Sequence, residues 1–208
     1  MSDRSAFQSW FDAHPELDAE ALSTLDAFVG LLKEESEKQN LIAKSTVSVI
    51  WDRHILDSAQ LLDHVPRGTR RILDIGSGAG LPGLVMAILQ PDLHVTLIEQ
   101  RRKRCEFLND AVSDLSLENV TVIMGDVAKL EADPFPVITA RAFAHIQKIV
   151  SSTAQFRTNE TVYILPKGAS AEGELALLPK TATFHVEQSI TEPSAGILIG
   201  TICDTVTV

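Results

Sequence analysis

The stretch Arg71-Ile-Leu-Asp-Ile-Gly-Ser-Gly-Ala-Gly-Leu-Pro-Gly83 decides how the rest of the sequence is interpreted. Residues 72–75 are branched and apolar except for the acid Asp74. A turn that is rich in glycine follows them. Beyond the turn, apolar residues recur at helical spacing at Leu84, Val85 and Ile88. The stretch therefore predicts a strand, a tight turn and a helix.

The three glycines of the turn favour a bound cofactor. Gly76, Gly78 and Gly80 lack the Cβ that would disfavour a positive φ or hold a ligand away from the backbone. The N-terminus of the following helix offers unpaired N–H groups and a positive dipole end. We therefore expect a cofactor that carries adenosine and an anionic group to lie against this turn.

An acid at the end of the next predicted strand strengthens this interpretation. Glu99 closes the strand His94–Glu99 and stands 19 residues after Gly80. An acid about 20 residues beyond such a turn commonly accepts hydrogen bonds from ribose hydroxyls. The turn and Glu99 together predict a nucleoside site, and the alternative is a structural turn beside a solvated glutamate.

Composition and charge place few limits on the partners. The chain has 208 residues, 45% of them hydrophobic, and a net charge of −10, which suits a globular protein with one substantial core. Residues 1–40 hold 9 acids and 3 bases, which leaves 19 acids and 15 bases for residues 41–208. Within the second part, bases cluster at 67–71 and at Arg101–Arg104. Charge alone neither indicates nor excludes a nucleic-acid partner.

The sequence carries no pattern of a membrane span, a signal peptide or a metal site. No apolar run approaches the ~18 residues of a membrane helix, and residues 1–25 lack the regions of a signal peptide. Cys105 and Cys203 form no metal-spaced pair, and the histidines show no ligand spacing either. We expect a cytoplasmic monomer with reduced thiols, no metal and no membrane attachment.

Helical periodicity dominates the residues before the first strand. Apolar residues at helical spacing predict amphipathic helices from Leu17 to Leu32 and from Val47 to Leu62. A break at Pro66-Arg-Gly68 follows, so we divide the chain into a helical extension, 1–66, and a cofactor-binding domain, 67–208. On the second helix, His54 is either a half-buried histidine satisfied by a backbone carbonyl or part of a rim that faces the substrate.

Strands and helices alternate after Glu99, which predicts right-handed crossovers and a parallel, doubly wound α/β sheet. The further strands are expected at 120–124, 137–140 and 161–165. The last two, Phe184–Ile190 and Ile197–Val206, have too short a link for a helix and must pair antiparallel. A mostly parallel sheet of seven strands with a C-terminal hairpin is the arrangement of class I methyltransferases.

Ligands on such sheets bind beyond the carboxyl ends of the strands. There, Asp126 and the backbone of Val127 and Ala128 are placed to meet an adenine edge, although Asp126 could equally be a helix N-cap. Arg141 and Lys167 follow two adjacent strands and could hold the cofactor's carboxylate, an RNA phosphate or a guanine edge, or be ordinary surface cations.

Several segments carry a resemblance to a known family. They are Asn40-Leu41, Arg53-His-Ile-Leu-Asp-Ser58, Leu73–Gly83, Arg141-Ala-Phe143 and Lys167-Gly168. In order and spacing they resemble the bacterial 16S ribosomal RNA guanine-N7 methyltransferases, also called the glucose-inhibited division protein B family. The resemblance covers roughly residues 40–180.

The resemblance implies an S-adenosylmethionine enzyme that methylates N7 of one guanine in 16S ribosomal RNA of the small subunit. Its cofactor contacts correspond here to Gly76, Leu81, Val127, Ala128 and Arg141, and a substrate-side base corresponds to Lys167. We therefore take Arg141 and Lys167 as the candidate catalytic residues. The family usually has an arginine where this chain has Asp126 and a glutamate where it has Ala128, which weakens any side-chain role at these two positions.

The proposed chemistry agrees with the lack of a nucleophile or acid–base pair in the sequence. Guanine N7 has a free lone pair, so alignment and electrostatic positioning can suffice. Three alternatives stay open: a small-molecule methyltransferase, a nicotinamide-dependent oxidoreductase and a nucleotide-binding module without turnover. The oxidoreductase is disfavoured because Tyr163 and Lys167, spaced as in short-chain dehydrogenases, fall on a strand and not on a helix.

Overall fold

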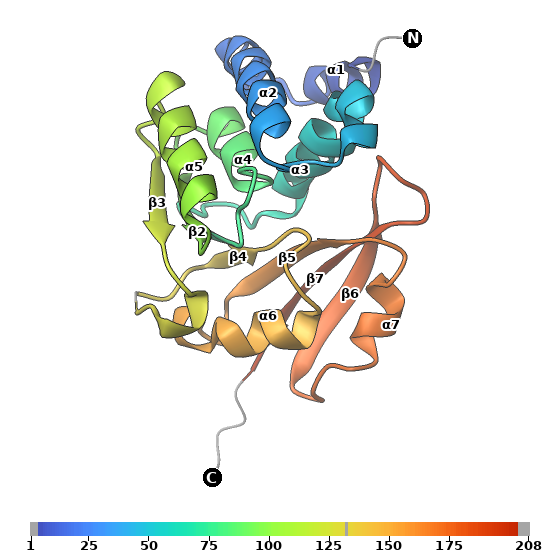
Figure 1. Ribbon diagram of the computed structural model, residues 1–208. Helices are drawn as coiled ribbons and strands as arrows, with labels where there is room; N and C mark the ends of the chain where they lie inside the picture. The colour runs from blue at the N-terminus through green and yellow to red at the C-terminus, as the bar shows by residue number, and fades with distance from the viewer. Residues whose placement is uncertain (1–3, 132, 204–208) are drawn as a thin grey trace.

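The computed structural model describes residues 4–131 and 133–203 as a seven-stranded sheet between two layers of helices (Figure 1). The strand order is β3-β2-β1-β4-β5-β7-β6. The strands are β1 (Arg71–Ile75), β2 (His94–Glu99), β3 (Val120–Met124), β4 (Val137–Thr139), β5 (Val162–Lys167), β6 (Ala182–Gln188) and β7 (Gly196–Ile202).

Strand pairing confirms the predicted fold class. Strands β1 to β5 pair in parallel, while β7 pairs antiparallel with both β5 and β6. The C-terminal hairpin therefore closes one edge of the sheet, as the short link between its strands requires. The end of the predicted last strand, 204–206, lies outside the described residues.

Helices cover both faces of the sheet (Figure 1). One face carries α1 (Ser5–Asp12), α2 (Glu20–Lys38), α3 (Asp57–Ala59), α4 (Gly83–Leu89) and α5 (Arg102–Asp114). The other face carries α6 (Ile146–Ser152) and α7 (Ala171–Leu175). None of the helices in the described ranges has the length and apolar character needed to cross a membrane.

Alternation along the central strands supplies both layers with core residues. On β1, Ile72 packs with the helices of the first face, whereas Leu73 and Ile75 pack in a second cluster with α6. On β5, Ile164 joins the first cluster and Tyr163 joins the second. Strands buried on both faces read as continuous apolar runs, which is why these strands were visible in the sequence.

The N-terminal helices differ from the prediction in two ways. Helix α1 was not predicted, and it buries Phe7, Trp10 and Phe11. The predicted helix 47–62 is instead a series of short pieces: a 3-10 segment (Lys44–Val49), a π turn (Trp51–Leu56), α3 and a second 3-10 segment (Gln60–His64). These pieces share one apolar core with the sheet, and the division at residue 66 stays a prediction.

The point where strand order reverses lies between β1 and β4. From β1 the chain moves outward through β2 and β3 and then returns to place β4 on the other side of β1. The register aligns the ends of these strands, with Ile75 opposite Ile98, Glu99 opposite Met124 and Asp74 opposite Thr139. Such a switch point is where open α/β sheets bind their ligands.

Gly80 offers a test of the turn that shapes this end of the sheet. Its φ is +79°, and an added Cβ would overlap the side chain of Leu84 on α4. We expect Gly80→Ala to lower the free energy of unfolding by about 1–3 kcal/mol, because it adds backbone strain and a steric clash. The control, Gly30→Ala in the middle of α2, has open space around its Cβ and should raise stability by about 0.5–1 kcal/mol. Urea unfolding measures both, and equal effects at the two positions would contradict this account.

Candidate active site

The glycine turn and Glu99 come together as the sequence predicts. Gly76, Gly78 and Gly80 all have positive φ, at 65°, 55° and 79°. Glu99 is buried, and its Oε2 accepts a hydrogen bond of 3.0 Å from the backbone N–H of Gly78. Its Oε1 accepts a second, of 2.8 Å, from the N–H of Arg101. The carboxylate is thus fixed at the turn, with oxygen lone pairs left for further donors.

The three glycines have different surroundings. Gly76 borders a cavity at the ends of the first three strands. Gly78 lies under Glu99 and Arg104, and Gly80 lets α4 approach the turn closely. The side chain of Leu81 is buried in the apolar core, so any contact with a cofactor would come from its backbone.

A cavity of about 270 Å³ lies at the carboxyl ends of β1, β2 and β3. Its walls include the predicted residues Gly76, Glu99, Asp126 and Val127. Asp126 also caps the short helical turn after β3, because its Oδ1 accepts from the N–H of Ala128 at 3.1 Å. Asp126 is therefore a helix N-cap and also lines the cavity. Ala128 is exposed, and its N–H already donates to Asp126.

A second cavity, of about 430 Å³, lies beyond the ends of β4 and β5. It is lined by Arg141 and Lys167, the two predicted catalytic residues, together with Asp57 and Glu174. The two cavities share Ala142 and Phe143 in their walls. The predicted residues that line these cavities thus form two groups that meet at Ala142 and Phe143. Four other predicted residues, Gly78, Gly80, Leu81 and Ala128, line neither cavity.

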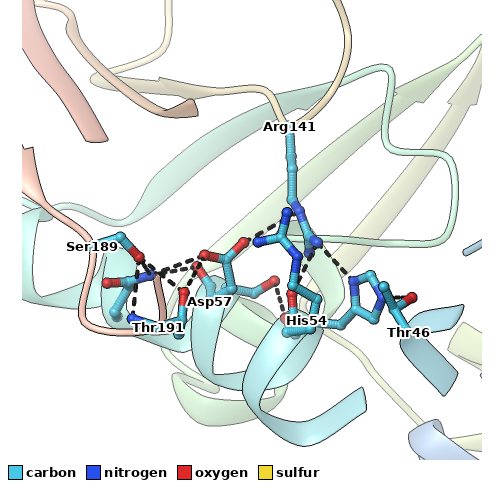
Figure 2. Close-up of polar contacts among 9 residues, drawn as sticks. Thr46, His54, Asp57, Arg141, Ser189 and Thr191 are labelled. Atoms are coloured by element: carbon cyan, nitrogen blue, oxygen red, sulfur yellow. Dashed lines mark hydrogen bonds and ion pairs between the residues drawn. The ribbon is translucent and has the colours of Figure 1, made fainter. Parts of the chain in front are cut away.

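Arg141 is held by an extensive polar network (Figure 2). Its Nη2 donates to the carbonyl of Arg53 at 3.1 Å and to Nδ1 of His54 at 2.7 Å. Its Nε lies 3.4 Å from Oδ2 of Asp57. On a regular helix the i,i+4 spacing would let Asp57 pair with Arg53. The segment before Asp57 is a π turn, which changes that spacing, and Asp57 pairs with Arg141.

His54 is neutral in this network. Its Nδ1 must accept the hydrogen bond from Arg141, while its Nε2 lies 2.7 Å from Oγ1 of Thr46. The Thr46 hydroxyl donates to the carbonyl of Ala43, so Nε2 carries the proton and donates to Thr46. Burial, followed by the charges of Arg141 and Arg53, lowers the pKa of His54 to about 3. His54 is buried and lines neither cavity, but the predicted backbone partner is wrong, because both ring nitrogens contact side chains, those of Arg141 and Thr46.

The C-terminal hairpin completes the network from the opposite side (Figure 2). Oγ1 of Thr191 donates to Oδ1 of Asp57 at 2.9 Å. Gln60 donates to Oγ of Ser189 at 3.1 Å and accepts from the N–H of Ile190 at 2.9 Å. Residues more than 120 positions apart in the chain thus fix Asp57, and Asp57 in turn orients Arg141.

Lys167 is also held in place. Its Nζ donates to the carbonyl of Ala144 at 2.6 Å and forms an ion pair of 3.0 Å with Glu174. Burial works against the charge of Glu174, but hydrogen bonds from the Ile146 N–H and from Lys167 keep the pKa of Glu174 below its usual value. Lys167 and Glu174 therefore fix the loop that follows Arg141 as well as lining the cavity.

Two buried polar atoms near the switch point have no hydrogen-bond partner within the described ranges: Nη1 of Arg141 and Oδ1 of Asp74. Asp74 is fully buried, and burial raises its pKa to about 7. Its Oδ2 accepts from the N–H of Gly83, which starts α4. Asp74 and Arg141 are close enough for their charges to interact. Unpaired buried groups of opposite charge are costly unless a ligand carries matching groups.

Comparison with known proteins identifies the family. Residues 21–197 match the family model GidB, described as rRNA small subunit methyltransferase G. The chain belongs to the GidB family. This membership confirms the predicted recognition and the predicted class of enzyme, a methyltransferase of small-subunit ribosomal RNA with S-adenosylmethionine as its cofactor.

Relatives of the GidB chain match over most of its length. Ribosomal RNA small subunit methyltransferase G of Novosphingobium aromaticivorans is 47% identical over 198 residues, which are 93% of this chain and 86% of the relative. The protein of the same name from Erythrobacter litoralis is 49% identical over 185 residues, 88% of this chain and 89% of the relative.

Solved structures with low sequence identity share the fold. A variant of MtNAS in complex with S-adenosylmethionine superposes with a TM-score of 0.58 at 17% identity, over 90% of this chain and 80% of that chain. Precorrin-6y C5,15-methyltransferase from Geobacter metallireducens gives 0.52 at 14% identity, over 80% and 92%. At these identities the likeness supports the fold class.

The sequence did not predict roles for Asp57, Glu174 or Phe143. Asp57 and Phe143 lie within segments that carried the family resemblance, so the segments were visible but the contacts were not. Glu174 lies in a weak helical stretch, and its partner Lys167 comes from the preceding strand. Asp57 and its partner Arg141 are 84 residues apart, so their pairing leaves no local pattern.

The raised pKa of Asp74 predicts a pH-dependent effect of Asp74→Asn on stability. Between pH 4 and 7 the folded GidB chain retains a proton that the unfolded chain has lost, so stability falls as pH rises through this range. Asn cannot ionise, so the variant escapes this loss. From pH 5 to pH 8, the free energy of unfolding of the variant minus that of wild type should therefore increase by about 2 kcal/mol. Urea unfolding without added cofactor measures this difference. Asp92→Asn, in an exposed pair with Arg70, is the control, and the same pH trend in both variants would refute the explanation.

Proposed function

We propose that this methyltransferase modifies N7 of one guanine in 16S ribosomal RNA, with the cofactor across the β1–β4 switch point and the base in the larger cavity. The observation that supports this best is the adjoining pair of cavities, one bordered by the glycine turn and Glu99 and the other by Arg141 and Lys167. A donor site and an acceptor site must adjoin for direct transfer between them.

The residues present fit S-adenosylmethionine. The unpaired Nη1 of Arg141 suits a carboxylate, and the unpaired Oδ1 of Asp74 suits an ammonium group. The amino-acid end of the cofactor carries both groups. Glu99, Asp126 and Val127 line the smaller cavity, and we assign Glu99 to the ribose hydroxyls and Asp126 with the backbone of Val127 to adenine.

The chain's own residues would act by position and charge. When bound, the cofactor supplies a methyl group on a positively charged sulfur. Arg141 holds the amino-acid end, because His54 and Asp57 fix its guanidinium in one orientation. Lys167, paired with Glu174 and bonded to the Ala144 carbonyl, keeps one of its three N–H donors for the guanine or a neighbouring phosphate. No proton must leave N7, so no general base is needed.

A basic surface supports an RNA substrate for this acidic protein. Arg101–Arg104 line a hollow of about 390 Å³ together with Gln39 and Asn40. Arg104 and Arg101 also border the cofactor cavity. Phosphates bound along this run would lead the RNA toward the site, and such binding weakens steeply with added salt.

We also propose that the enzyme works as a metal-free monomer in the cytoplasm, where the small subunit is assembled. Over residues 4–131 and 133–203, no group of three or more His, Cys, Asp and Glu side chains is arranged to hold a metal ion.

The target atom can be tested directly in cells. N7-methylguanine sites in 16S ribosomal RNA should be mapped by chemical cleavage in RNA from cells with and without the gene. We expect one site to disappear with the gene and to return when the wild-type protein is supplied. Identical maps from both strains would overturn the assignment.

Arg141→Ala should reduce methylation without preventing cofactor-free folding. Loss of a charge-assisted contact costs about 1.5–3 kcal/mol, or roughly 10- to 150-fold in the rate or in cofactor affinity. The measurements are methyl transfer to small-subunit RNA and binding of S-adenosylhomocysteine by calorimetry. Arg70→Ala, which removes an exposed cation paired with Asp92, is the control. Near wild-type values for Arg141→Ala would remove Arg141 from the mechanism.

A further inference from the structure

Phe143 stands where the two cavities meet. It is 38% exposed, which is unusual for a large apolar side chain in this protein. Together with Ala142 it forms part of the wall of both cavities. A side chain in this position can touch groups bound on either side.

The backbone around Phe143 is strained and held on both sides. Ala142 has a φ of +50°, a conformation that residues with a Cβ rarely adopt. Before it, Arg141 is fixed by His54. After it, Lys167 donates to the carbonyl of Ala144. Strain of this kind persists only where the surroundings enforce it, and it concentrates at functional sites.

One part of the ring packs on the glycine turn, and another part is exposed. The ring packs against Gly76 so closely that a Cβ on Gly76 would overlap it. The rest of the ring stays partly open to the cavities that it borders. The glycine thus has a second use, which is to seat an aromatic ring on the turn.

We propose that the exposed face of Phe143 stacks on the target guanine and stabilises the positive charge that the base acquires during methyl transfer. This inference rests on the proposed function. The N7 lone pair forms the new N–C bond while the S–C bond breaks and leaves its electron pair on sulfur. The positive charge therefore passes from sulfur to the guanine ring, and no proton is exchanged.

An aromatic ring suits this charge movement. Bases stack on aromatic side chains in nucleic-acid sites, and the negative face of the ring attracts a cation. A neutral guanine gains only the stacking, whereas the transition state and the methylated product gain the attraction as well. Binding that strengthens toward the transition state is the kind that raises the rate.

A competing role for Phe143 is simple packing over Gly76. Leucine would keep apolar cover on the turn but would remove the aromatic face, and tyrosine would keep that face. The pair Phe143→Leu and Phe143→Tyr therefore separates the two roles. Leu177→Ala is the matched control, because Leu177 is also an exposed apolar residue but lines neither cavity.

The experiment combines rates with binding of the product RNA. Under single turnover with saturating small-subunit RNA, Phe143→Leu should be slower by about 10-fold or more, and Phe143→Tyr should stay within about 3-fold of wild type. S-adenosylhomocysteine should bind Phe143→Leu as it binds wild type. With S-adenosylhomocysteine present, wild type should bind the N7-methylated RNA about 2- to 30-fold more tightly than unmethylated RNA, and Phe143→Leu should lose this preference.

Different results would contradict the stacking role, the charge stabilisation and the proposed function. Full activity of Phe143→Leu, equal loss in Phe143→Tyr, or a parallel loss of S-adenosylhomocysteine affinity would each overturn the stacking role while the wild type still forms N7-methylguanine. Equal binding of the two RNAs by wild type would overturn the charge stabilisation. If wild type forms no N7-methylguanine, the proposed function fails, and this inference fails with it.

Discussion

The site depends on one constraint, which is that the buried guanidinium of Arg141 must be surrounded by groups that satisfy it. A buried charge is tolerated only with good partners. His54, Asp57 and the Arg53 carbonyl supply them from the helical segment before the sheet. Because His54 stays neutral and accepts, it holds the cation without adding a second positive charge. The N-terminal helices therefore contribute to the site as well as to the core.

The glycine turn meets this network across the switch point. Gly76 follows β1 and Arg141 follows β4, so strand order alone brings them together. Asp74 at the end of β1 adds a buried acid with one unpaired oxygen. The unpaired atoms of Asp74 and Arg141 match the proposed cofactor, because its amino-acid end carries both an ammonium and a carboxylate group.

Much of this arrangement could be predicted from the sequence, and the limits have physical causes. Continuous apolar runs and the glycine turn are local patterns, so the strands, the terminal hairpin and the placement of Glu99 were predicted correctly. The π turn at Trp51–Leu56 could not be predicted, because apolar spacing does not distinguish it from a regular helix. The pairing of Asp57 with Arg141 and of Lys167 with Glu174 depends on tertiary packing, and no local signal reports it.

The tie between Asp57 and the hairpin residue Thr191 has a consequence for biosynthesis. A ribosome makes the glycine turn and most of the parallel strands well before it makes this hairpin. Contacts between segments so distant in the chain slow folding, because the long intervening loop must be closed first. A nascent chain can therefore have a folded core while Asp57, which orients Arg141, still lacks its hydrogen bond from Thr191. The site is complete only when β6 and β7 have left the exit tunnel of the ribosome.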